Sequence, residues 1–183
     1  MNTIGFDDGP FDQSFRGDVP LVGVVCARTR IDGVLIGKVR RDGRDATRRI
    51  AELVSRSPFH VQAHAILLQG IAVGGFNVVD VQALHEALER PVLVVVRRPP
   101  DLARIRRVLL EKVPGGARKW RLIERLGPPE PLDGVWVQRV GLDLSRARQV
   151  LRASRLHGSF PEPLRLAHLI AGAVGRGTSK GGA

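Results

Sequence analysis

The chain has 183 residues, of which 43% are hydrophobic and 26% are charged. This is ordinary globular composition for one domain with one core, and it argues against wholesale disorder. Lys and Arg total 29 against 18 Asp and Glu, which gives a formal net charge of +11. Such a surface attracts polyanions, so nucleic acid (DNA or RNA) is the partner we predict. The alternative is a cytoplasm whose proteins are generally rich in Arg.

The single cysteine, Cys26, excludes an intrachain disulfide and a cysteine-based zinc site, which fits a reducing compartment. The first residues include Asp7 and Asp8 in place of a basic and apolar leader, and no run of about 18 apolar residues occurs. We therefore expect a cytoplasmic protein without a membrane segment. Residues 1–174 are expected to form a single domain, and the Gly-rich residues 175–183 a disordered tail.

The apolar pattern predicts a strand, a hairpin, and then strands alternating with helices. Strands are predicted at residues 3–7, 19–29, 33–39, 65–68, 92–96 and 135–140. Helices are predicted from Asp45 to before Pro58, around 81–88 and 102–109, within 114–133, at 144–154 and from Pro161 onward. This order predicts an α/β fold with a mixed sheet: an N-terminal antiparallel hairpin region, parallel strands beside it, and helices on both faces.

Four acids stand at the ends of predicted strands or the starts of predicted helices: Asp7, Asp8, Asp45 and Asp143. Carboxylates at strand ends can converge on one edge of a sheet, where Mg²⁺ or Mn²⁺ finds the oxygen ligands it prefers. Two such ions about 3.5–4 Å apart are a common device for phosphodiester cleavage. Each acid also has a structural interpretation. Asp45 and Asp143 could cap helices, and residues 7–10 could form only a turn.

Other standard chemistries lack a motif. Residues 70–75 are Gly-rich but match neither a P-loop nor a dinucleotide fingerprint, and the five His show no zinc-ligand spacing. Tyr is absent and aromatic residues make up 4%, so contact with nucleic acid would run mainly from Arg and Lys to phosphate. His168, taken alone beside the apolar face of the last helix, is typical of a packed core residue.

Three sequence blocks together resemble an uncharacterised, mainly archaeal family related to endonuclease V, which is also labelled a deoxyuridine endonuclease. The blocks are Ile-Gly-Phe-Asp-Asp-Gly-Pro-Phe at 4–11, Asp-Gly-Arg-Asp-Ala-Thr at 42–47, and Gly-Gly-Phe-Asn-Val-Val-Asp at 74–80. The likeness covers nearly the whole chain. It implies a ribonuclease H-like (endonuclease V-like) fold, in agreement with the predicted order of strands and helices.

The resemblance also implies a site. Asp7 matches the first metal-binding Asp of endonuclease V, and Asp45 falls where those enzymes have a Glu. The segment 160–168, Phe-Pro-Glu-Pro-Leu-Arg-Leu-Ala-His, is similar to a conserved C-terminal segment and makes His168 a site residue. Arg97 stands in place of a Lys and could reach phosphate. The implied catalytic residues are Asp7, Asp45 and His168; the metal ligands for Mg²⁺ or Mn²⁺ are Asp7, Asp8, Asp45 and Gln69; the nucleic-acid contacts are Arg97, Arg98 and Arg165.

Two departures from endonuclease V matter. Gln69 replaces its second metal-binding Asp, which should weaken the metal site, although Asp8 or Asp80 could compensate. The stretch 37–43 lacks the aromatic and Pro residues of the wedge that endonuclease V inserts at a lesion. The sequence therefore predicts a Mg²⁺-dependent endonuclease acting at deaminated bases, uracil or hypoxanthine. The alternative is a non-catalytic nucleic-acid-binding protein with a degenerate nuclease site.

Overall fold

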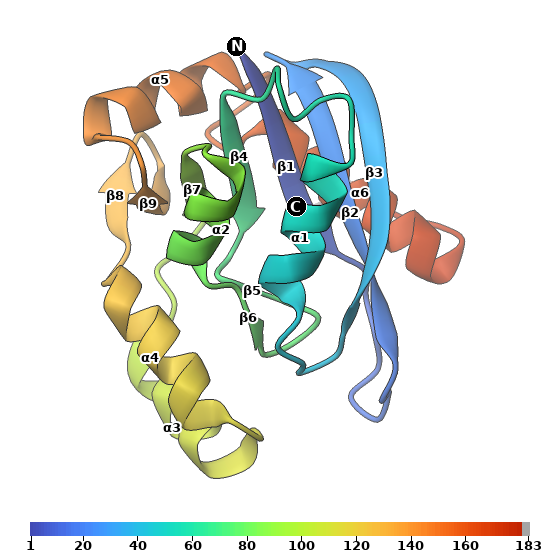
Figure 1. Cartoon of the computed structure of the whole chain (residues 1–183), viewed down its shortest axis with the longest axis vertical. Helices are drawn as coiled ribbons and strands as arrows, with labels where there is room; N and C mark the ends of the chain where they lie inside the picture. Colours follow the sequence, from blue (N-terminus) through green and yellow to red (C-terminus); the bar gives the residue numbers. More distant parts are fainter. Residues whose placement is uncertain (181–183) are drawn as a thin grey trace.

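A seven-stranded mixed sheet forms the centre of the computed structural model, which describes residues 1–180. Its strands are β1 (Asn2–Asp8), β2 (Asp18–Ala27), β3 (Arg30–Arg40), β4 (Ala65–Gln69), β7 (Val92–Val96), β8 (Glu130–Leu132) and β9 (Val135–Val140). Their spatial order is β3-β2-β1-β4-β7-β9-β8 (Figure 1). A small separate hairpin consists of β5 (Ala72–Val73) and β6 (Asn77–Val78).

The helices are α1 (Ala46–Ser55), α2 (Val81–Leu88), α3 (Leu102–Lys112), α4 (Gly116–Leu126), α5 (Leu144–Ala153) and α6 (Glu162–Arg176). Successive side chains of a strand point to opposite faces of the sheet, and both faces are apolar. Ile66 and Leu68 of β4 join the core under α1 and α2, while Ala65 and Leu67 join the core under α5 and the start of α6. The predicted α/β class, with helices on both faces, is confirmed.

The N-terminal part of the sheet follows the prediction. β1 pairs antiparallel with β2, and β2 with β3, while β1, β4 and β7 are parallel neighbours. Beyond the parallel strands, β9 runs antiparallel to β7. The cause is β8, which the sequence analysis missed. It forms a hairpin with β9 around Asp133 and Gly134, whose φ angles of 49° and 87° suit a tight two-residue turn.

Helix α6 lies along β1 and β2 because Gly5 permits a close approach. A Cβ atom on Gly5 would stand 2.7 Å from the carbonyl carbon of Pro163, closer than side chains tolerate. The helix also continues through Gly175 and Arg176, so the predicted domain boundary at residue 174 falls inside a helix. Residues 181–183 of the predicted tail lie outside the described residues.

The pair α3 and α4 stands apart from the sheet (Figure 1). The two helices pack on each other and on β6 around Leu109, Ile123 and Val78. Gly116 sits where a Cβ would meet the carbonyl oxygen of Leu109, so this crossing also depends on a glycine. Within residues 1–180, no helix has the length and apolarity needed to cross a membrane.

Candidate functional site

A cleft of about 650 Å³ opens at the carboxyl end of β1. β1 contributes Asp7 and Asp8, β4 contributes Gln69, and α6 contributes His168 and Arg176. The parallel register pairs the last residues of β1 with those of β4, which brings the two strand ends to one edge of the sheet. Four residues predicted for the site, Asp7, Asp8, Gln69 and His168, therefore line one cleft.

Asp7 and His168 form the central pair of the cleft. The Nδ1 atom of His168 lies 2.7 Å from Oδ2 of Asp7. The side chain of His168 is 42% exposed, whereas that of Asp7 is only 7% exposed. Burial raises the pKa of Asp7 above its usual value, and the hydrogen bond from His168 offsets this only in part. The contact and the exposure of the ring show that His168 lies in the cleft beside Asp7 and does not pack in the core.

Asp8 has the strongest pKa shift among the acids of the cleft. Burial, followed by the neighbouring charge of Asp7, raises the pKa of Asp8 to about 7, although a hydrogen bond from the backbone of Gly74 opposes the shift. A carboxyl group with this pKa changes its charge near neutral pH. The cleft therefore carries a negative charge that depends on pH and on any cation bound there.

Gln69 carries an unsatisfied polar atom. Its buried Oε1 accepts no hydrogen bond from any residue in the described part of the chain. Leaving such an acceptor unpaired costs about 1–3 kcal/mol, and a bound water or a cation would remove this cost. An oxygen donor set of Asp7, Asp8 and Gln69 fits Mg²⁺ or Mn²⁺, because these ions favour oxygen ligands and keep several waters. Within residues 1–180, however, no three His, Cys, Asp or Glu residues are grouped to hold a metal.

The structure does not bring Asp45 to Asp7. The carboxylate of Asp45 accepts hydrogen bonds from the backbone N–H of Arg40 at 3.1 Å and from Nδ2 of Asn77 at 2.7 Å. Burial raises the pKa of Asp45, but these hydrogen bonds together hold it below its usual value. Its side chain does not cap α1, so that alternative is wrong; Oδ1 of Asn77 accepts the N–H of Ala46 instead. In this structure Asp45 fastens the start of α1 to the β5–β6 hairpin.

Two other acids have structural roles. Asp143 caps α5 by accepting a hydrogen bond from the backbone N–H of Arg146 at 2.7 Å, which confirms the capping interpretation. Asp80 caps α2 and also contacts Arg125 at 2.5 Å. Asp80 does not line the cleft, so it offers no compensation for the amide at position 69.

Of the three arginines predicted to contact phosphate, two are exposed and the third is held in an ion pair. Arg97 and Arg98 follow β7 and are exposed, with the guanidinium of Arg97 lying 4.2 Å from the ring centre of Phe160. Arg165 instead forms a two-pronged pair with Glu162, at 2.9 and 2.6 Å. Its charge is therefore already neutralised by a buried carboxylate.

The family model described as endonuclease dU matches residues 1–175 of the chain. The chain belongs to the endonuclease dU family. A UPF0215 protein of Deinococcus radiodurans is 56% identical over 180 residues, which cover 98% of this chain and 92% of that protein. The predicted family is thereby confirmed.

Solved structures agree with this family. A protein of unknown function from Archaeoglobus fulgidus superposes with a TM-score of 0.89 at 32% identity, covering 96% of this chain and 98% of that one. An endonuclease V of Ciona intestinalis, solved with DNA containing an inosine, gives a TM-score of 0.56 at 13% identity, covering 91% and 82%. The second likeness shows the fold, so the predicted ribonuclease H-like fold is confirmed.

The sequence analysis missed Arg176, because the residue was placed in a disordered tail. Residues 168, 172 and 176 all line the cleft, and a spacing of four repeats one face of a helix. In this member of the endonuclease dU family, the spacing of four residues from His168 was therefore the sequence signal that could have predicted Arg176 as a cleft residue.

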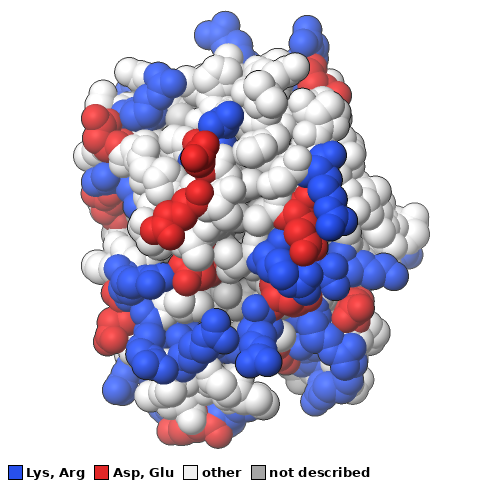
Figure 2. All heavy atoms as spheres, viewed as in Figure 1, with Lys and Arg blue, Asp and Glu red and all other residues white. Residues whose placement is uncertain are grey.

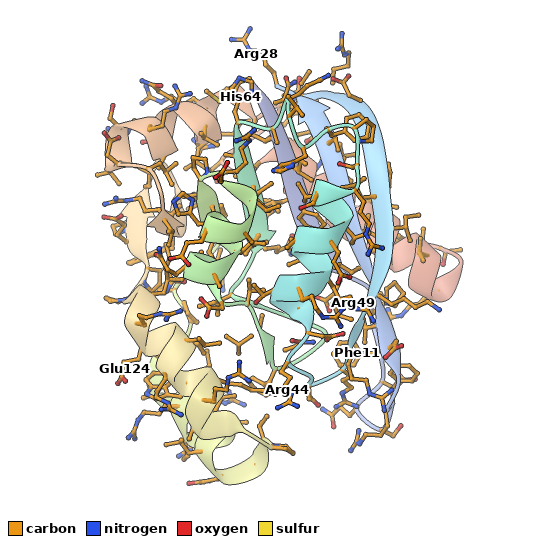
Figure 3. All side chains as sticks on the ribbon, viewed as in Figure 1. Phe11, Arg28, Arg44, Arg49, His64 and Glu124 are labelled. Atoms are coloured by element: carbon orange, nitrogen blue, oxygen red, sulfur yellow. The ribbon has the colours of Figure 1, made fainter. Side chains whose placement is uncertain are left out.

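Figure 2 shows a band of Lys and Arg across the lower part of the molecule, and Figure 3 places Arg44 and Arg49 on this same face.

Proposed function

We propose that this endonuclease dU family protein is a divalent-cation-dependent endonuclease that cuts nucleic acid at deaminated bases, uracil or hypoxanthine. The observation that carries the proposal is the Asp7–His168 pair beside the unsatisfied oxygen of Gln69, in one cleft at the edge of the sheet. The family description, the inosine-containing DNA bound to the Ciona enzyme and the net charge of +11 support the choice of substrate.

Asp7, Asp8 and Gln69 would hold Mg²⁺ or Mn²⁺. When bound, the cation supplies positive charge that stabilises the phosphodiester in its transition state and acidifies a coordinated water. The Nδ1–H of His168 donates to Asp7, which leaves Nε2 as the proton acceptor on the exposed side of the ring. His168 thus accepts a proton from the attacking water, and Asp7 keeps its ring in that orientation. Arg97 and Arg176 attract the phosphates of the strand.

Strand cleavage tests the proposal. Labelled oligonucleotides containing deoxyuridine, deoxyinosine or no lesion are incubated with Mg²⁺ or Mn²⁺, beside the Asp7→Asn and His168→Ala variants. We expect lesion-dependent nicking that both substitutions reduce by at least about 100-fold, the scale of a lost acid–base group. Asp143→Asn is the control, because that carboxylate only caps α5. Nicking that survives Asp7→Asn would overturn the assignment.

A second function has observations of its own. Three observations favour a protein that binds nucleic acid without cutting it. Gln69 stands where endonuclease V has an acid, Asp45 does not line the cleft, and residues 1–180 contain no three-residue metal cluster. Such a protein would bind oligonucleotides with a steep salt dependence, and a chelator would not change its affinity. Salt-sensitive binding, together with no nicking of any of the oligonucleotides in Mg²⁺ or Mn²⁺, would support this second function over the first.

A further inference from the structure

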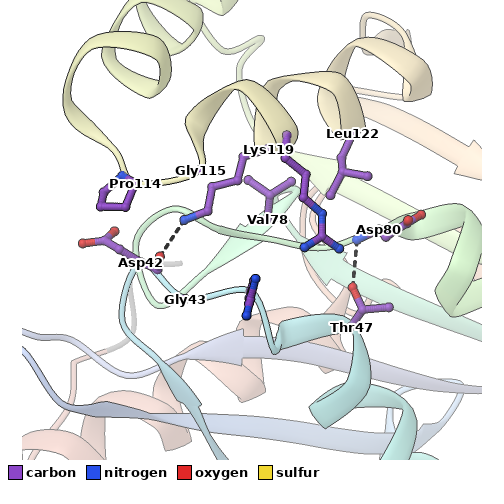
Figure 4. Close-up of a pocket in the computed structure, with 11 residues that line it drawn as sticks. Asp42, Gly43, Thr47, Val78, Asp80, Pro114, Gly115, Lys119 and Leu122 are labelled. Carbon is purple, nitrogen blue, oxygen red and sulfur yellow. Dashed lines mark hydrogen bonds between the residues drawn. The ribbon is translucent and has the colours of Figure 1, made fainter.

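A second cavity lies between α4 and the loop that joins β3 to α1 (Figure 4). Its volume is about 390 Å³, within the range of pockets that bind small ligands. Figure 4 shows Lys119 reaching from α4 toward Asp42, while Val78, Leu122 and Pro114 supply apolar surface. No part of the proposed cleavage site uses this pocket.

Three cations without a carboxylate partner line the pocket. Arg44 and Arg118 form no ion pair with any residue in the range 1–180, and Lys119 donates to the carbonyl oxygen of Asp42 at 2.5 Å. Lys119 is only 6% exposed, so most of its side chain is out of contact with water. An ammonium has three N–H donors, and the described residues use one of them. A buried cation with spare donors requires a further acceptor.

The acids near the pocket do not meet this requirement. The side chain of Asp42 accepts a hydrogen bond from the backbone of Phe76 and lies 3.3 Å from Arg41, and Asp80 is held by Arg125 and by the first turn of α2. The pocket also includes Gly115, which precedes α4, and the positive end of a helix dipole favours anions. Charge and donors together select a ligand with an anionic, oxygen-rich group.

The pocket and the cleft are neighbours. The backbone N–H of Asp42 donates to the carbonyl of Gly74 at 2.8 Å. A Cβ atom on the adjacent Gly75 would stand 2.5 Å from Oδ1 of Asp42, which lines the pocket, and 3.6 Å from the ring of Phe11, which lines the cleft. The loop at residues 74 and 75 therefore contacts residues that line both cavities, so we consider a polymer as their shared ligand.

We propose that this pocket binds one nucleotide of the strand that runs into the cleft, with its phosphate on Arg44, Arg118 and Lys119 and its nucleoside against Val78 and Leu122. The strand part of this proposal rests on the proposed function. The binding of a single nucleotide does not, because it requires neither a divalent cation nor Asp7.

Calorimetric titration with deoxyuridine 5′-monophosphate, in a chelator and at low salt, tests the pocket directly. Arg118→Gln and Lys119→Met should each weaken binding by about tenfold or more, the usual weight of a charge-assisted hydrogen bond. Arg121→Gln removes the same charge from an exposed position of α4 outside the pocket, and should change affinity by no more than about twofold. Asp7→Asn should leave nucleotide binding unchanged.

No binding at millimolar nucleotide, or equal losses in Arg118→Gln and Arg121→Gln, would overturn the proposal. Arg118 is exposed, so its variant remains a test even if Lys119→Met does not fold. The strand part is tested with a single-stranded oligonucleotide, whose affinity should fall more in Arg118→Gln than in Arg121→Gln. If the affinity for the oligonucleotide is the same in Arg118→Gln as in the natural protein, the strand part is overturned and the pocket binds only a free nucleotide. Nicking is a separate readout, and its absence would remove the proposed nuclease while leaving nucleotide binding intact.

Discussion

Replacing Gln69 by Asp is the sharpest test of the proposed metal site. The substitution puts a carboxylate where a buried amide oxygen has no hydrogen-bond partner, next to the strand that ends in Asp7 and Asp8. Without a cation, a further carboxylate in this buried cleft should destabilise the fold by about 1–3 kcal/mol. With Mn²⁺ present, the added charge should tighten binding by about tenfold, which corresponds to roughly 1.4 kcal/mol.

Thermal unfolding with and without Mn²⁺ measures both effects. Because ligand binding stabilises a protein in proportion to the logarithm of its affinity, the Mn²⁺-induced rise in Tm should be larger for Gln69→Asp than for the natural protein by about 3–6 °C. Gln69→Leu is the matched control. It removes the unsatisfied oxygen, so it should raise stability without Mn²⁺ and reduce the Mn²⁺-induced rise. Equal Mn²⁺ effects in all three proteins would refute the reasoning that residue 69 faces a cation.

Three further predictions concern the frame around the cleft. Asp45→Asn should lower stability by about 1–2 kcal/mol in urea denaturation, because it weakens the hydrogen bond to Asn77, yet it should leave Mn²⁺ binding unchanged. Glu162→Gln should destabilise the protein at neutral pH but not in acid, as urea denaturation at the two pH values would measure. The hydrogen bond from Arg165 lowers the pKa of Glu162, so the ion pair stabilises the fold above the usual pKa near 4.5 and loses this effect as the pH falls. Gly5→Ala should cost about 1–3 kcal/mol and reduce nicking, because the new methyl group would push α6 away from β1.

Much of the fold was predictable because its signals are local. Alternating and continuous apolar runs marked the hairpin and the buried strands, and parallel strand ends meet at one edge whatever the details of packing. That rule led to the expectation for Asp7 and Asp8, while Gln69 was added through the resemblance to endonuclease V; all three line one cleft. β8 escaped the prediction because it has only three residues, one of them Pro131, and the direction of β9 depends on it.

The position of Asp45 was not predictable, because it depends on contacts distant in sequence. Asn77 comes from the β5–β6 hairpin, 32 residues further along the chain, and binds Asp45 and the start of α1 at once. By contrast, the pairing of Glu162 with Arg165 was visible as an acid and a base three residues apart on a helix. Arg165 should therefore have been assigned to an ion pair from the sequence alone.

Five acids with clearly shifted pKa values show two kinds of environment. Asp45, Asp133 and Glu162 have their pKa values lowered, because neighbouring donors stabilise the charged form. Asp7 and Asp8 have theirs raised, beside an amide oxygen that lacks a donor. The first arrangement stabilises the fold. The second costs stability in the free protein and would become favourable if the proposed cation bound there, so the cleft at the end of β1 is where binding and cleavage should be tested.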